Sequence, residues 1–213
     1  MNVDELQFFD PRDEVRMTEN RLPHWEQQER TYFLTFRTAD SIPAGVAGAF
    51  HDELDAWLAW HPKPWDEKTE REYWTRFGQR TEQWLDESHG ACLLRQPGIA
   101  AVVAGALGFH EGKSCTQHAW VVMPNHIHAV CTLLGDATLG RLLHSWKSFT
   151  ASEINRRTGA SGAFWQKDYF DRLIRSGEHF WRCARYIRRN PAHLRPGEYL
   201  HWESPEVARA LDG

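Results

Sequence analysis

The stretch VVMPNHIHAV (residues 121–130) decides the fold, because it joins two strand-like apolar runs through a tight Pro-Asn turn. The runs at residues 116–123 and 126–134 are predicted to form a β-hairpin. Side chains alternate along a strand, so His126 and His128 share one face, with Cα atoms about 6.6 Å apart, while Ile127 and Ala129 point the other way. Two imidazoles at this spacing can bind one cation, although hydrogen-bonded or exposed histidines would give the same pattern.

The composition indicates a globular protein rather than a membrane or secreted one. A chain of 213 residues buries roughly 70% of its unfolded surface, enough for one domain with its own core. The four cysteines are widely spaced without a CxxC pair, and the first residues lack an apolar signal segment. The longest apolar run, residues 98–109, is too short for a membrane span. We expect one domain over residues 1–213, in the reducing cytoplasm and associated with the nucleoid.

Charge is unevenly distributed, although the net charge is only −4. Residues 110–200 carry 13 basic and 7 acidic side chains, so the half that contains the histidine pair is basic. Aromatic residues are interleaved with these arginines. Arginines and exposed rings suit backbone neutralisation and base stacking on single-stranded nucleic acid, whereas buried rings would belong to the core.

The order of predicted elements indicates an α+β fold. Strands are expected at residues 30–38, 116–123 and 126–134 and within 164–176, and helices at 46–60, 66–88, 98–110, 139–157 and 177–190. A ferredoxin-like antiparallel sheet with helices on one face accounts for this order. The helical segment at about 45–110 is then an insertion after the first strand, rich in Trp and acidic residues.

The last predicted helix offers a third group near the histidines. Tyr186 and Asn190 are four residues apart and therefore lie on one edge of the helix, and Pro191 ends the helix beside the Asn190 amide. The apolar stripe that contains Phe180 and Ile187 should face the sheet, which would place both polar residues near the histidine face. Alternatively, Asn190 is an ordinary helix cap and Tyr186 a packing residue.

Four segments in this order resemble one family: VVMPNHIHAV, SWKSFTASEINRR, FWQKDYFDRLIRS and RYIRRNP. The chain resembles the IS200-like single-tyrosine transposases of the HUH superfamily, in particular the REP-associated tyrosine transposases. The resemblance covers residues 30–40 and 113–195 and is poorest before residue 110.

The resemblance implies a metal-dependent endonuclease and strand transferase that acts on single-stranded DNA. It implies His126, His128 and Asn190 as ligands of a divalent metal, Mg²⁺ or Mn²⁺, and Tyr186 as the nucleophile that forms a 5′-phosphotyrosine. A phenol is a weak nucleophile at neutral pH, so a polarising cation suits this chemistry. Tyr169 is the rival nucleophile, but it lacks a helical Asn partner four residues on.

Supporting roles are also expected in the basic half. Candidate DNA contacts are Lys147, Arg172, Arg175, Arg185 and Arg189, with Arg188 beside them. Asp168 and Asp171 are candidates to supply a carboxylate to the site or to pair with arginines.

The expected partner is single-stranded DNA, in particular hairpins or repetitive elements. A monomer is favoured over a homodimer, because the insertion could cover a dimerising edge. Two other functions fit parts of the sequence: a nucleic-acid-binding regulator on the same fold, and a small-molecule metallohydrolase in which His118 is a further ligand.

Overall fold

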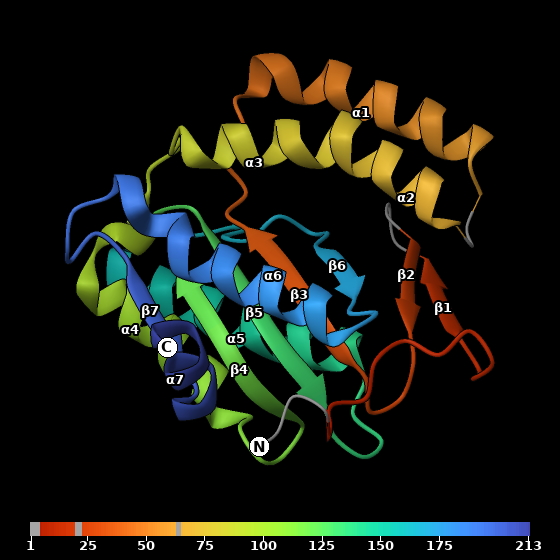
Figure 1. The fold of residues 1–213 in the computed structure, drawn as a ribbon. Helices are drawn as coiled ribbons and strands as arrows, with labels where there is room; N and C mark the ends of the chain where they lie inside the picture. The colour runs from red at the N-terminus through yellow and green to blue at the C-terminus, as the bar shows by residue number, and fades with distance from the viewer. Residues whose placement is uncertain (1–4, 20–22, 63–64) are drawn as a thin grey trace.

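A five-stranded antiparallel sheet forms the centre of the molecule (Figure 1). The structure is a computed structural model that describes residues 5–19, 23–62 and 65–213. The strand order is β6-β3-β5-β4-β7. The strands are β3 (Thr31–Arg37), β4 (Cys115–Val122), β5 (His126–Leu133), β6 (Phe170–Leu173) and β7 (Leu200–Glu203). The four predicted strands are confirmed, and β7 adds an edge that the sequence patterns do not indicate.

All helices except α7 lie in the predicted segments. After β3 come α1 (Ala44–Trp60), α2 (Glu67–Tyr73) and α3 (Gln79–Asp86), and a π-helical turn (Trp74–Gly78) joins α2 to α3. Next are α4 (Pro97–Phe109) before β4, α5 (Leu139–Thr158) between β5 and β6, and α6 (Gly177–Arg189) and α7 (Pro205–Asp212). Short 3₁₀ turns lie at Leu93–Arg95 and Asn190–His193. None of the helices in the described ranges combines the length and apolarity that a bilayer crossing requires.

Helices cover both faces of the sheet, so the expectation of helices on one face is wrong. Ile127 and Ala129 of β5 pack in one cluster with α4 and α5. Val130, on the opposite face, packs with Phe180 and Ile187 of α6. Figure 1 shows α6 across the near face of the strands and α5 behind them. The physical reason is that seven of the eight β5 residues are buried, and a strand buried on both faces requires cover on both.

The helices α1, α2 and α3 form a separate layer beside the sheet (Figure 1, orange and yellow). Their own aromatic cluster includes Phe50, Trp57 and Phe77. This layer is joined to β6, because Tyr73 stacks on Phe170 with ring centroids 6.2 Å apart. By contrast α4, within the same expected insertion, packs in the sheet core.

A short hairpin of β1 (Arg16–Glu19) and β2 (Pro23–Glu26) precedes the sheet. His24 of β2 is buried, and its Nε2 lies 3.0 Å from Oδ1 of Asp168, while its Nδ1 contacts the Asp171 carboxylate. Burial opposes the charged imidazole, but the hydrogen bonds to Asp168 and Asp171 raise the pKa of His24 to about 9. The charged histidine therefore holds the hairpin against β6.

Candidate metal centre

The histidine pair lies at the start of β5, directly after the Pro124–Asn125 turn. The backbone N–H of Met123 donates to the carbonyl of His126 at 2.8 Å and closes this turn. Both imidazoles are buried, on the α6 face, and their ring centroids are 4.7 Å apart. The alternation of side chains along the strand therefore places both rings together, as predicted.

The Nδ1 atom of each imidazole has a hydrogen-bond partner. Nδ1 of His128 lies 2.8 Å from the hydroxyl of Thr35, its cross-strand neighbour on β3. Nδ1 of His126 lies 2.8 Å from Oδ1 of Asn125. Metal-binding histidines usually have such a second partner, which fixes the ring and leaves the other nitrogen for the ion. Here the Nε2 atoms are the remaining ligand atoms.

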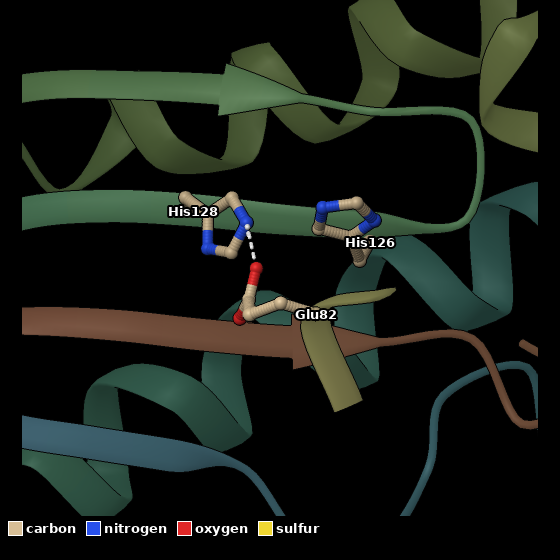
Figure 2. A group of neighbouring side chains, drawn as sticks. All are labelled: Glu82, His126 and His128. Carbon is tan, nitrogen blue, oxygen red and sulfur yellow. Dashed lines mark ion pairs between the residues drawn. The ribbon is translucent and has the colours of Figure 1, made fainter. Parts of the chain in front are cut away.

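Glu82 of α3 completes a group of three ligands (Figure 2). The ligand atoms of Glu82, His126 and His128 all lie within 4.8 Å of one another. The Glu82 carboxylate is 3.3 Å from Nε2 of His128, and only 13% of its side chain is exposed. Sequence reasoning does not identify Glu82, because it is one of many acidic residues in a helical segment. The π-helical turn just before α3 is a feature often found near functional sites, but it is not visible in the sequence.

Tyr186 of α6 reaches the same group. Its hydroxyl donates a short hydrogen bond to the Glu82 carboxylate and lies 3.4 Å from Nε2 of His128. Nδ2 of Asn190 donates to this hydroxyl at 3.1 Å. Oδ1 of Asn190 is buried and has no hydrogen-bond partner in the described chain. The structure thus brings together the four residues expected at the site and adds the Glu82 carboxylate.

The protonation states at the site follow from burial and from the charges. Burial favours the neutral form of Glu82, but its interactions with His128 outweigh burial and lower the pKa of Glu82 to about 2. Burial, with the neighbouring His128, also lowers the pKa of His126 well below its usual value. Burial and then the Glu82 charge raise the pKa of Tyr186, so its hydroxyl keeps the proton. An anionic carboxylate and a neutral imidazole are forms that bind metal ions.

These residues fit a divalent metal ion. Nε2 of His126 is buried and lacks a hydrogen-bond partner among the described residues, which costs about 1–3 kcal/mol. A cation bound by His126, His128 and Glu82 would remove this cost. Imidazole and carboxylate ligands accept several metals, among them Mn²⁺ and Zn²⁺, so the donor set does not identify the ion.

The predicted DNA contacts lie in different environments. Arg172 and Arg175 both form ion pairs with Glu70 of α2, at 3.3 Å and 3.0 Å. Nζ of Lys147, on α5, donates to the carbonyl of Lys167 at 2.7 Å. The three other candidate arginines lie on α6.

On α6, Arg185 and Arg189 are exposed and have no ion pair within the described part of the chain. Arg188 instead forms ion pairs with Glu203 and Asp212, so its guanidinium is already paired within the protein. Arg185 and Arg189 are therefore the more available of these cations.

The rival candidates lie away from the three-ligand group. Tyr169 packs in the cluster that contains α4 and α5, and its ring stacks on His24 at 4.0 Å. Asp168 and Asp171 both contact His24. His118 is hydrogen-bonded to Thr132 at 2.7 Å and is not part of the group.

No protein-family model matches the chain, and no curated protein matches it. Among solved structures, the chain is similar to a REP-associated tyrosine transposase bound to a REP hairpin. The similarity covers 83% of this chain and 74% of that chain, with 16% sequence identity and a TM-score of 0.44. That protein is of the kind that the four sequence motifs resemble.

Proposed function

We propose that this protein is a metal-dependent endonuclease and strand transferase for single-stranded DNA. The observation that carries the proposal is the position of Tyr186, whose hydroxyl oxygen lies 3.4 Å from Nε2 of His128. This phenol is therefore adjacent to a group of side chains that could hold a metal ion. A nucleophile beside such a group is suited to attack a phosphodiester.

In the proposed reaction, the hydroxyl oxygen of Tyr186 attacks the phosphorus, and the bond to the 3′ oxygen of the DNA breaks. The phenol loses its proton and the leaving oxygen gains one, which gives a 5′-phosphotyrosine and a free 3′-hydroxyl. The new ester retains the energy of the phosphodiester. A 3′-hydroxyl can therefore reverse the attack and rejoin a strand without ATP.

The side chains at the site have separable roles in this reaction. A divalent ion, Mg²⁺ or Mn²⁺, held by His126, His128 and Glu82 would supply Lewis-acid polarisation of the phosphate. The Glu82 carboxylate already accepts the hydrogen bond of Tyr186, so it would orient the phenol beside the ion. Asn190 donates to the same hydroxyl and orients it, and its unpartnered Oδ1 is the atom that would serve as a further ligand.

The fold and the substrate are part of the same proposal. The strand order β6-β3-β5-β4, with β4 and β5 as a hairpin, supports a ferredoxin-like core. We propose that this core belongs to a single domain over residues 1–213 in the cytoplasm. The four sequence motifs support single-stranded DNA with a hairpin or repetitive element as substrate. We propose that the protein acts as a monomer, with Lys147, Arg172, Arg175, Arg185 and Arg189 as DNA contacts.

A covalent adduct tests the proposal directly. The protein is incubated with Mn²⁺ and single-stranded DNA hairpins, and adducts are separated on a denaturing gel and located by mass spectrometry. We expect an adduct with the wild type and with Tyr169→Phe, and none with Tyr186→Phe. Thermal melting checks that each variant is folded.

Two outcomes would contradict the proposal. An adduct in Tyr186→Phe that disappears in Tyr169→Phe would assign the nucleophile to Tyr169. Binding of hairpins without any adduct, at all metal concentrations, would instead favour a regulator that binds nucleic acid on the same fold.

A further inference from the structure

A cleft extends from the candidate metal centre between the sheet and the layer of α1, α2 and α3. Thr35 and Glu82 line it, and both contact His128. Trp74 and Phe170, both half-buried, are aromatic residues in its lining. The cleft therefore connects the proposed site of cleavage with rings on which bases can stack.

Arg37 is a cation in this cleft that no part of the proposed mechanism uses. It is the last residue of β3 and pairs with His126 across the strands, so both side chains lie on the same face. Among the described residues, its side chain makes one hydrogen bond, from Nη1 to the hydroxyl of Ser41 at 3.1 Å. Within the residues that the structure describes, no carboxylate forms an ion pair with it.

The surroundings of Arg37 favour an external anion as its partner. Arg37 is half-buried, and burial lowers its pKa to about 10. Asp168 is the acidic group whose charge acts on Arg37, but its carboxylate is hydrogen-bonded to the charged His24. A guanidinium presents five N–H donors in a planar fork, so most donors of Arg37 are free for a phosphate.

We infer that Arg37 binds a DNA phosphate in this cleft and so positions the strand for attack by Tyr186. The inference rests on the proposed function, because it takes single-stranded DNA as the occupant. The charge of the guanidinium complements the phosphate, and the rings of Trp74 and Phe170 line the same cleft, where neighbouring bases could stack. Arg37 is thus a positioning residue that the four sequence motifs do not indicate.

Binding without cleavage is the first measurement. The metal-free protein is titrated into a fluorescent single-stranded oligonucleotide, and anisotropy is recorded at several salt concentrations. We expect Arg37→Ala to weaken binding by about 10- to 100-fold, the loss of a charged hydrogen-bonded contact. The slope of log affinity against log salt should fall in magnitude by about one. Arg37→Lys should retain the slope but lose part of the affinity, because an ammonium lacks the fork.

The matched control is Arg156→Ala. Arg156 is exposed on α5, on the other face of the sheet, and pairs with Glu153. We expect its binding and salt slope to equal those of the wild type. If Arg37→Ala does not fold, Arg37→Met is measured in its place, because methionine keeps an unbranched apolar side chain without the charge.

Adduct formation and melting with Mn²⁺ separate this inference from the proposed function. If Arg37 binds a DNA phosphate, the Arg37→Ala variant should form the adduct more slowly at low DNA concentration. It should retain the Mn²⁺-induced stabilisation. Wild-type binding and salt slope in both Arg37→Ala and Arg37→Met would overturn the inference, even if the wild type forms an adduct. If Arg37→Ala weakens DNA binding but the wild type forms no adduct, the phosphate site is supported and the proposed nuclease activity is contradicted.

Discussion

Replacing Glu82 with Gln tests whether α3 supplies the third metal ligand. The change preserves the size of the side chain and an oxygen atom, but it removes the negative charge beside His126 and His128. The loss of a residue that only supports a metal ligand costs about 10- to 100-fold in affinity. We therefore expect the loss of this carboxylate to weaken Mn²⁺ binding by about 100-fold or more.

The effect on thermal stability follows from mass action. A metal concentration of about 100 times Kd adds about 2.7 kcal/mol to the free energy of unfolding. For a domain of this size, each kcal/mol raises Tm by roughly 2–4 °C, so the wild type gains roughly 5–11 °C. At the same concentration, a variant with 100-fold weaker affinity gains about 0.4 kcal/mol, or roughly 1–2 °C.

The assay is thermal melting in a Mn²⁺ titration, with isothermal calorimetry for the wild-type Kd. Glu53→Gln is the matched control, because Glu53 lies in the same helical layer but pairs with Arg76 and Arg80 instead of the histidines. It should retain the full metal-induced shift. Melting without metal provides the baseline for each variant.

The variant Asn190→Ala distinguishes a site in which Glu82 is the third ligand from one in which Asn190 is the third ligand, as the sequence motifs imply. We expect Asn190→Ala to lose less of the shift than Glu82→Gln, because the amide oxygen would be a neutral further ligand whereas Glu82 supplies a negative charge. A full wild-type shift in Glu82→Gln, with its loss in Asn190→Ala, would refute the assignment of Glu82 as the third ligand.

Two further predictions concern the contacts around the site. Thr35→Val removes the partner of Nδ1 of His128, so we expect Mn²⁺ affinity to fall by about 10- to 100-fold in calorimetry; an unchanged Kd would show that this contact does not support the ligand. The pKa of His24 is raised from 6.5 to about 9, so its contribution to stability, of the order of 3 kcal/mol, is complete below about pH 6.5 and is lost as the pH rises through about 9. Denaturant unfolding should show this loss in the wild type and not in His24→Gln, and identical pH profiles would contradict it.

Local periodicity was sufficient to predict part of the site. The two-residue repeat of the strand places His126 beside His128, and the four-residue spacing of the helix places Tyr186 beside Asn190. Both relations depend on backbone geometry within one element, which the sequence specifies. The apolar stripe of α6, with Phe180 among its residues, then directs the helix edge towards the histidines.

Glu82 could not be predicted because its contact depends on packing between distant elements. It lies 44 positions before His126, within a helical segment in which many acidic residues are exposed. The direction of its side chain depends on how the layer of α1, α2 and α3 packs against β6, for example through Tyr73 and Phe170. Periodicity within the segment contains no information about that packing.

The helices on both faces of the sheet had a signal in the sequence. The run AVC (residues 129–131) contains no polar residue, and uninterrupted apolar runs are typical of strands that are buried on both faces. The expectation of one covered face followed from the general fold pattern and did not use this run. In the structure, Ala129 is buried on the face covered by α4 and α5, and Val130 is buried on the opposite face against α6.

The helical layer has a direct connection to the proposed chemistry, although its sequence resembles the family least. Glu82 supplies the negative charge that lies between the histidine pair and Tyr186, and the same layer forms the aromatic wall of the cleft that contains Arg37. A carboxylate on a separate layer can approach the histidines only when that layer is packed on the sheet. Metal binding and occupancy of the cleft by DNA should therefore depend on the same packing contact, between Tyr73 and Phe170.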